Sequence, residues 1–150
     1  MKKLFFFPIL MTVSFVLKAQ TAEDSVKTTI NRFFEGMKKG DTALIKSTMT
    51  EGIIFQTIAR KKEGGLVVKT EDVASFIKFV GELKKDIPDE RIIFETIKID
   101  GALASVWTPY KFYSGATFSH CGANSFQLVN TDGAWKIQYI IDTRRKQGCE

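Results

Sequence analysis

The residue best suited to acid–base chemistry is His120, the only histidine in the sequence. An unperturbed imidazole has a pKa of about 6.5, so it can donate or accept a proton near neutral pH. Asn124 lies four residues further on, and in an extended strand residues separated by an even number share a face. The pair could form the polar part of a small-molecule site. A structural histidine, hydrogen-bonded at the edge of the fold, is the competing interpretation.

Aromatic side chains with polar tips are typical walls of a binding pocket. Tyr110, Tyr139 and Phe55 are the candidates, and we predict that they contact a ligand together with His120 and Asn124. Core packing is the alternative role for each of these aromatic side chains.

Two carboxylates fall within apolar strand-like runs. Glu95 is in phase with Ile93 and Ile97, and on an apolar face it could act as an acid or base. A one-residue bulge would instead turn it to solvent, which we favour because curved sheets often contain bulges. Asp142 is expected to point outward, toward Arg144 or a neighbouring strand, and to have a structural ion-pair role.

The sequence predicts neither a metal site nor a cofactor. One histidine and two separated cysteines lack the clustered spacing of zinc sites. The stretch Glu63-Gly64-Gly65 lacks the Gly-Lys pattern that opens a helix in phosphate-binding loops.

The elements that must position these residues begin with helices. Apolar residues recur at spacings of three and four over 22–39, which predicts an amphipathic helix. Gly40 is placed to end it, and Asp41 can cap a second helix that runs to about Met49. A third helix is predicted to begin at Thr70 and to end before Pro88.

After Pro88 the apolar period becomes that of strands. Asp-Gly pairs at 100–101 and 132–133 separate alternating runs, which predicts two hairpins. A tight second turn pairs Thr131 with Ala134, and the same register sets Phe126 opposite Tyr139. Extended further, it sets His120 opposite Arg145 and places the imidazole on the inner face.

This order of elements resembles the nuclear transport factor 2-like superfamily. The closing stretch SHCGANSFQLVNTDGAWKIQYIIDTRR over 119–145 and the Gly40-Asp41 pair are similar to its secreted SnoaL-like members. The resemblance implies an α+β fold, a cone-shaped curved antiparallel sheet with three N-terminal helices packed into it. It also implies an apolar pocket in the cone and a homodimer through the outer sheet face. Isomerases, dehydratases and hydrolases occur among such proteins, but none of their catalytic residue sets can be placed on this chain.

The first nineteen residues have the pattern of a cleavable secretory signal. Lys2 and Lys3 precede an apolar run from Leu4 to Leu17, and Ala19 stands before the expected cut. That run has 14 residues, shorter than the about 20 that span a bilayer. We therefore expect residues 20–150 to form one exported domain, periplasmic or secreted, without a stable membrane anchor.

Signal removal changes the charge and the expected redox state. Without Lys2, Lys3 and Lys18, Lys+Arg falls from 22 to 19 against 17 Asp+Glu, a net charge of +2, which weakens the case for nucleic-acid binding. Export also makes a bond between Cys121 and Cys149 chemically feasible. Gly148 could turn the tail back far enough; two free thiols are the alternative.

Three functions follow from these features. The leading hypothesis is a cofactor-free domain that binds a small apolar molecule. The second is an enzyme of the isomerase, dehydratase or hydrolase type that uses His120 as its acid or base. The third is a dimeric interaction module whose cone is filled by its own side chains.

Overall fold

The computed structural model describes residues 21–83 and 87–149. The predicted signal at 1–19 and the basic pair Lys84-Lys85 lie outside these residues. Within them, no helix is both long and apolar enough to cross a membrane. Three helices and seven strands make up the described chain: α1 (Ala22–Lys39), α2 (Thr42–Ser47), β1 (Met49–Arg60), β2 (Leu66–Glu71), α3 (Val73–Glu82), β3 (Pro88–Ile92), β4 (Thr96–Asp100), β5 (Leu103–Ser114), β6 (Thr117–Thr131) and β7 (Ala134–Thr143).

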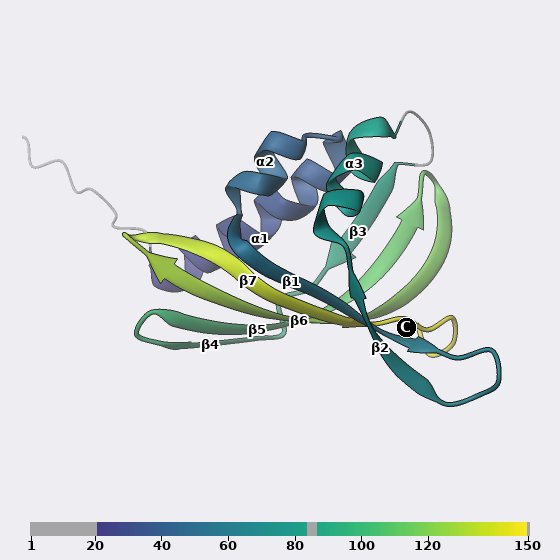
Figure 1. Ribbon diagram of the computed structural model, residues 1–150. Helices are drawn as coiled ribbons and strands as arrows, with labels where there is room; N and C mark the ends of the chain where they lie inside the picture. The colour runs from purple at the N-terminus through teal and green to yellow at the C-terminus, as the bar shows by residue number, and fades with distance from the viewer. Residues whose placement is uncertain (1–20, 84–86, 150) are drawn as a thin grey trace, which may run out of the picture.

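The strands form one curved sheet in the order β2-β1-β7-β6-β5-β3, with β4 also paired to β5. The three helices lie together on one side of this sheet, which bends around them (Figure 1). The predicted α+β architecture is confirmed. The sheet is not wholly antiparallel, however, because β1 runs parallel to β7.

The first two helices form where local chemistry predicts them. The buried residues of α1 include Val26, Ile30 and Phe33, which share one helical stripe. Gly40 ends α1 in the left-handed conformation at φ 68°, and the Asp41 carboxylate accepts the backbone N–H of Leu44 at 2.9 Å. These caps satisfy backbone groups that the helix ends leave unpaired.

The third helix begins later than predicted. It starts at Val73 with Asp72 as its N-cap, because Thr70 still pairs with Gln56 in the β1–β2 hairpin. Strand pairing therefore extends to Glu71 and shortens the helix from its N-terminal side.

Between Pro88 and the turn at Asp100-Gly101 the chain forms two strands, β3 and β4, rather than one continuous strand. Both strands pair with β5, and the chain between them is irregular. Glu95 lies in that interruption and is exposed. The solvent-facing alternative for Glu95 is confirmed, and the inward-facing alternative is wrong.

A bulge in β7 decides which of its side chains face the helices. Thr131 pairs with Ala134 as predicted, but further along Phe126 pairs with Ile140 rather than with Tyr139, which leaves Gln138 as an extra residue. Because side chains alternate along a strand, one inserted residue exchanges the two faces. The end of β7 is therefore inverted relative to the prediction.

The core lies between the helices and the inner sheet face. Its fully buried side chains include Phe126, Leu128 and Ile137 from the sheet and Ile30 from α1. Burial of each such side chain contributes about 1.5–3 kcal/mol. The inner face of the sheet is consequently fixed in position.

Candidate functional site

A cavity of about 590 Å³ lies between the helices and the inner face of the sheet. Its apolar surface comes mainly from phenylalanines on α1, α3 and three strands: Phe33, Phe34, Phe55, Phe76, Phe79, Phe112 and Phe126. Several rings contact one another, among them Phe55 and Phe76 at a centroid distance of 5.3 Å. Both volume and lining are typical of sites for small organic molecules.

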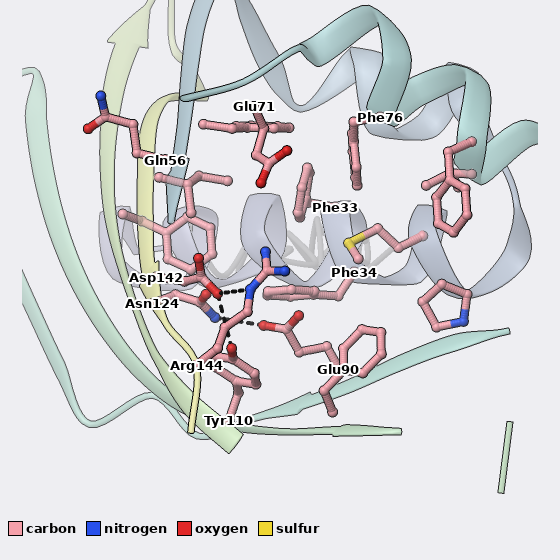
Figure 2. A pocket seen from close by; sticks show the side chains of 18 of the residues that line it. Phe33, Phe34, Gln56, Glu71, Phe76, Glu90, Tyr110, Asn124, Asp142 and Arg144 are labelled. Carbon is pink, nitrogen blue, oxygen red and sulfur yellow. Dashed lines mark hydrogen bonds and ion pairs between the residues drawn. The ribbon is translucent and has the colours of Figure 1, made fainter. Parts of the chain in front are cut away.

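Several polar residues line the sheet side of this cavity, and we call five of them the polar wall: Glu90, Tyr110, Asn124, Asp142 and Arg144. They come from β3, β5, β6 and the end of β7, and their functional groups gather in one region (Figure 2). Charged and hydrogen-bonding groups beside so much aromatic surface can orient a ligand.

The carboxyl group of Glu90 is the member of the polar wall whose pKa lies near neutrality. Asn124 Nδ2 donates to Glu90 Oε1 at 2.8 Å. Burial raises the pKa of Glu90 to about 7, the Asn124 hydrogen bond opposes that rise, and the charge of Asp142 adds to it. Near neutral pH this carboxyl group can therefore give up or take up a proton.

Asp142 links the other members of the polar wall. The hydroxyl of Tyr110 lies 3.0 Å from Asp142 Oδ2 and 2.9 Å from the backbone oxygen of Thr143. Arg144 Nε donates to the same Asp142 oxygen at 2.9 Å. Burial and the nearby carboxylates raise the pKa of Tyr110 well above its usual value, so the phenol keeps its proton.

A glycine opposite these groups allows them to meet. A Cβ atom on Gly122 would lie 1.8 Å from the backbone oxygen of Thr143 and 2.8 Å from the Tyr110 hydroxyl. No side chain fits at such distances. Gly122 is therefore required for Tyr110 to lie across β6 and reach the end of β7.

His120 lines the cavity, on the face where its register predicts it. Its ring stacks on Phe112 at a centroid distance of 4.8 Å, and Nδ1 lies 3.1 Å from Ser119 Oγ. Burial and the positive charge of Arg144 lower the pKa of His120. The imidazole is thus mainly neutral near pH 7, and it forms no ion pair with a carboxylate among the described residues.

Four of the five predicted ligand contacts line the cavity, namely Phe55, Tyr110, His120 and Asn124. Tyr139 does not, because the β7 bulge turns it to the other face, where its hydroxyl donates to Gln56 Oε1 at 2.6 Å. The same bulge brings Asp142 to the cavity, so the outward orientation predicted for it is wrong. Its predicted ion pair with Arg144 is present.

Sequence reasoning overlooked Glu90 and gave Arg144 only a surface role. Pro88, Glu90 and Ile92 alternate in phase along β3, and that period could have indicated an inward carboxylate. Arg144 carries no comparable signal, since its orientation depends on the extra residue in β7.

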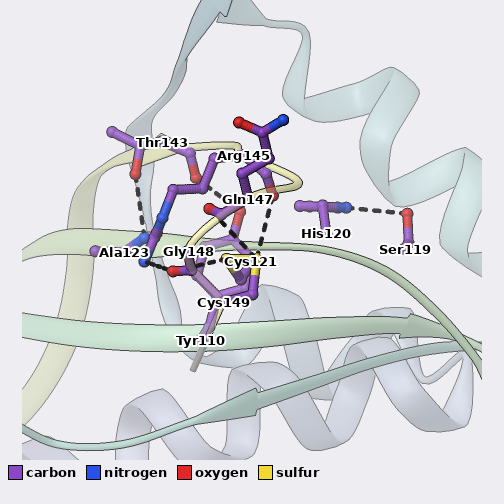
Figure 3. The surroundings of a disulfide bond; sticks show 10 residues. All are labelled: Tyr110, Ser119, His120, Cys121, Ala123, Thr143, Arg145, Gln147, Gly148 and Cys149. Carbon is purple, nitrogen blue, oxygen red and sulfur yellow. Dashed lines mark hydrogen bonds between the residues drawn. A yellow bond between two sulfur atoms is a disulfide. The ribbon is translucent and has the colours of Figure 1, made fainter.

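The two cysteines are joined in a disulfide with a Cα–Cα distance of 5.7 Å (Figure 3). Gly148 adopts φ 62° and turns the tail back, as predicted. The backbones of Cys121 and Arg145 also exchange two hydrogen bonds, of 2.9 and 2.8 Å. The segment just after Arg144 is therefore held against β6 both covalently and by backbone pairing.

No group of three or more His, Cys, Asp or Glu side chains is placed to hold a metal ion within residues 21–83 and 87–149. The chemistry that the described residues offer at this cavity is that of carboxyl, phenol, amide, imidazole and guanidinium groups.

Comparisons with known proteins identify similar structures but no similar sequences. No protein family profile matches the chain, and no curated protein matches its sequence. An NTF2-like protein of unknown function from Shewanella baltica is similar with a TM-score of 0.65 at 13% identity, over 83% of this chain and 94% of that chain.

Two further solved structures extend this likeness. A domain of unknown function with a cystatin-like fold from Nostoc punctiforme has a TM-score of 0.64 at 13% identity, over 84% of this chain and 78% of that chain. A candidate dehydratase of the NTF2-like family from Streptomyces avermitilis has a TM-score of 0.63 at 14% identity, over 81% and 94% of the two chains. At these identities the likeness establishes the fold.

Proposed function

We propose that this chain, whose fold is that of the nuclear transport factor 2-like proteins, binds a small and largely apolar molecule in its cavity. The observation that carries the proposal is the combination of a phenylalanine-lined cavity of about 590 Å³ with a polar wall on one side. Apolar surface provides the driving force, at about 25 cal/mol per Å² removed from water. The polar wall would set the orientation of the bound molecule.

A bulky side chain at the rim of the cavity tests this proposal. Ser75 lines the cavity from the first turn of α3 and is exposed, so Ser75→Trp should obstruct access without disturbing the core. Lys78→Trp is the matched control, because Lys78 is exposed on the same helix and does not line the cavity.

The measurement is a fluorescence titration with the neutral apolar dye N-phenylnaphthylamine, excited where tryptophan does not absorb. We expect saturable binding to the wild type and to Lys78→Trp, and at least about tenfold weaker binding to Ser75→Trp. Equal binding to all three proteins, or no binding to any, would count against the cavity as a binding site.

A second candidate is a cofactor-independent enzyme that moves a proton on the bound molecule, as an isomerase, dehydratase or hydrolase does. The specific observation in its favour is the Glu90 carboxyl group, whose pKa burial raises to about 7. His120 is the alternative acid or base. In a turnover screen, Glu90→Gln should abolish an activity that depends on Glu90, whereas His120→Gln should leave it largely intact; the opposite result would assign the role to His120.

The third candidate, an interaction module with a filled cone, has less support because the cone contains a cavity of this size. We retain the homodimer through the outer sheet face as a separate proposal. It is compatible with ligand binding, since the cavity lies on the inner face.

The proposed place of action is outside the cytoplasm, in the periplasm or the medium. The support is the signal pattern of residues 1–19 together with the Cys121–Cys149 disulfide, a bond that persists mainly in oxidising compartments.

A further inference from the structure

Arg144 presents an unused edge to the cavity. A guanidinium group has five N–H donors, and the hydrogen bond of Arg144 to Asp142 uses only Nε. No partner for Nη1 or Nη2 is present among the described residues. Figure 2 shows the outer end of this side chain directed into the cavity, above Glu90. A planar pair of donors is therefore free to face a ligand.

The direction of this edge is fixed before any ligand arrives. Asp142 holds Nε at 2.9 Å and is itself held by the Tyr110 hydroxyl. The backbone pair between Cys121 and Arg145 fixes the next residue of the chain. A donor pair whose direction is already set loses less entropy on binding than a free side chain does.

The charges around the cavity favour one kind of partner for that edge. Asp142 is already paired with Arg144, and His120 is mainly neutral because burial lowers its pKa. The positive group with a free donor edge is thus Arg144, and a cationic ligand would face it directly. Glu71 lies across the cavity and its charge acts on Arg144, but the two form no ion pair among the described residues, and both side chains are exposed, so that water screens their interaction.

The neighbouring Glu90 fits the same partner. In its protonated form this carboxyl group can donate its O–H to a second oxygen beside Arg144, whose charge acts on Glu90. A carboxylate accepts two parallel N–H bonds from a guanidinium group and keeps a further lone pair for an O–H donor. An alcohol oxygen cannot match that set of donors.

We infer that the molecule bound in the cavity carries a carboxylate group, held by the two Nη groups of Arg144 and by Glu90, with its apolar remainder among the phenylalanines. This inference rests on the proposed function and specifies its ligand class, an aromatic or aliphatic carboxylic acid. It also implies that Glu90 takes up a proton when the anion binds.

The direct test compares three probes of one shape by isothermal titration calorimetry at about pH 6, where most of Glu90 is protonated. The probes are phenylbutyrate, phenylbutyramide and phenylbutylamine. We expect the carboxylate to bind about tenfold more tightly than the amide, and the amine to bind most weakly. An amide or amine that binds as tightly as the carboxylate overturns this inference and leaves the proposed function standing. Failure of all three probes and of the neutral dye overturns both.

Two variants assign the effect to Arg144. Arg144→Met should remove the preference for carboxylate over amide while amide binding persists. Lys146→Met loses the same charge from an exposed neighbouring residue and should keep the preference. An equal loss of the carboxylate preference in both variants would mean that the effect depends on net charge alone, and it would overturn the assignment to Arg144.

A third variant tests the role of Glu90. Wild-type affinity for the carboxylate should fall as pH rises above about 7, by up to about tenfold per pH unit, because ionised Glu90 repels the anion. The groups that face Glu90 are Asn124, Asp142, Arg144 and the phenol of Tyr110. Glu90→Gln, which is neutral at every pH, should bind with little pH dependence in this range. An unchanged pH profile in Glu90→Gln would exclude Glu90 from the contact.

Discussion

Glu90 shows how burial changes the use of an ordinary carboxylate. Its strand carries it to the inner face, where Asn124 Nδ2 donates to it at 2.8 Å. That single hydrogen bond only partly offsets the loss of water, so the pKa of Glu90 rises to about 7. A group that is usually ionised thereby becomes able to exchange a proton near neutrality.

This shift makes the stability of the domain depend on pH. The folded-state pKa of Glu90 is raised from 4.5 to about 7, so between these values the folded state binds more protons and its stability falls as pH rises. Glu90→Gln lacks this loss. The unfolding free energy of Glu90→Gln, measured relative to that of the wild type, should therefore rise by on the order of 3 kcal/mol from about pH 4 to about pH 8.

Urea unfolding of both proteins at the two pH values measures this difference. Glu95→Gln is the matched control, because Glu95 is exposed, and it should follow the wild type at both values. A Glu90→Gln difference that does not change with pH would contradict the assignment of the titration to Glu90.

The site was partly predictable at the scale of single residues. Tyr110, His120 and Asn124 lie on the face that strand alternation predicts, because the alternation of side chains can be recognised from neighbouring residues alone. For Glu90 the only local signal is the short alternation of Pro88, Glu90 and Ile92, because β3 is five residues long. The raised pKa of Glu90 arises from burial by residues that are distant in the sequence, and a local pattern cannot indicate that burial.

At the scale of elements, the bulge in β7 decides the composition of the cavity. Gln138 donates to the backbone oxygen of Gly52 at 2.9 Å and accepts from Thr50 Oγ1 at 3.1 Å, so contacts with β1 accompany the extra residue. Without the bulge, Tyr139 would take the place of Ile140 opposite Phe126, and Ile141 would take the place of Asp142 opposite Asn124. The alternation of apolar residues fits both registers, and the contacts with β1 favour the bulged one.

The C-terminal tail adds a covalent link across the end of the sheet. Cys121 and Cys149 are 28 residues apart. Closing a loop of this size lowers the entropy of the unfolded chain and so stabilises the folded state by about 3 kcal/mol. The variant Cys121→Ser with Cys149→Ser should therefore unfold at a lower temperature than the oxidised wild type.

Differential scanning calorimetry with and without a reductant checks this expectation. Reductant should lower the midpoint of the wild type to nearly that of the double variant and leave the double variant unchanged. A wild type that is insensitive to complete reduction would show that the bond does not contribute to stability.

At the scale of the whole molecule, the two faces of the sheet differ in what covers them. The inner face is covered by helices and contains the cavity. The alternate positions of β5, Leu103 and Trp107, are 49% and 43% exposed. These two apolar side chains lie on the uncovered face, and we expect a homodimer to form there.

Trp107→Asp tests that expectation in the intact protein. A charge at the centre of an apolar interface opposes association, so the variant should sediment as a monomer where the wild type sediments as a dimer. Leu66→Asp, at an exposed end of the β1–β2 hairpin, should not change the oligomeric state. A wild type that is monomeric at high concentration would exclude the dimer.

The sequence by itself determined α1 with its caps, the tight turn at Asp132-Gly133 and the inward phase of β5. These features depend on helical period, capping side chains and positive φ at a turn, all of which are local. They were enough to predict the helices, the hairpins and a curved sheet.

Only the tertiary structure decided the polar wall. Whether Asp142 and Arg144 face the cavity depends on one extra residue in β7, and whether Glu90 titrates near neutrality depends on how much water its surroundings exclude. Both are properties of strands that meet across the sheet. The residues that we propose to bind the carboxylate therefore became recognisable only when β3, β6 and β7 were placed together.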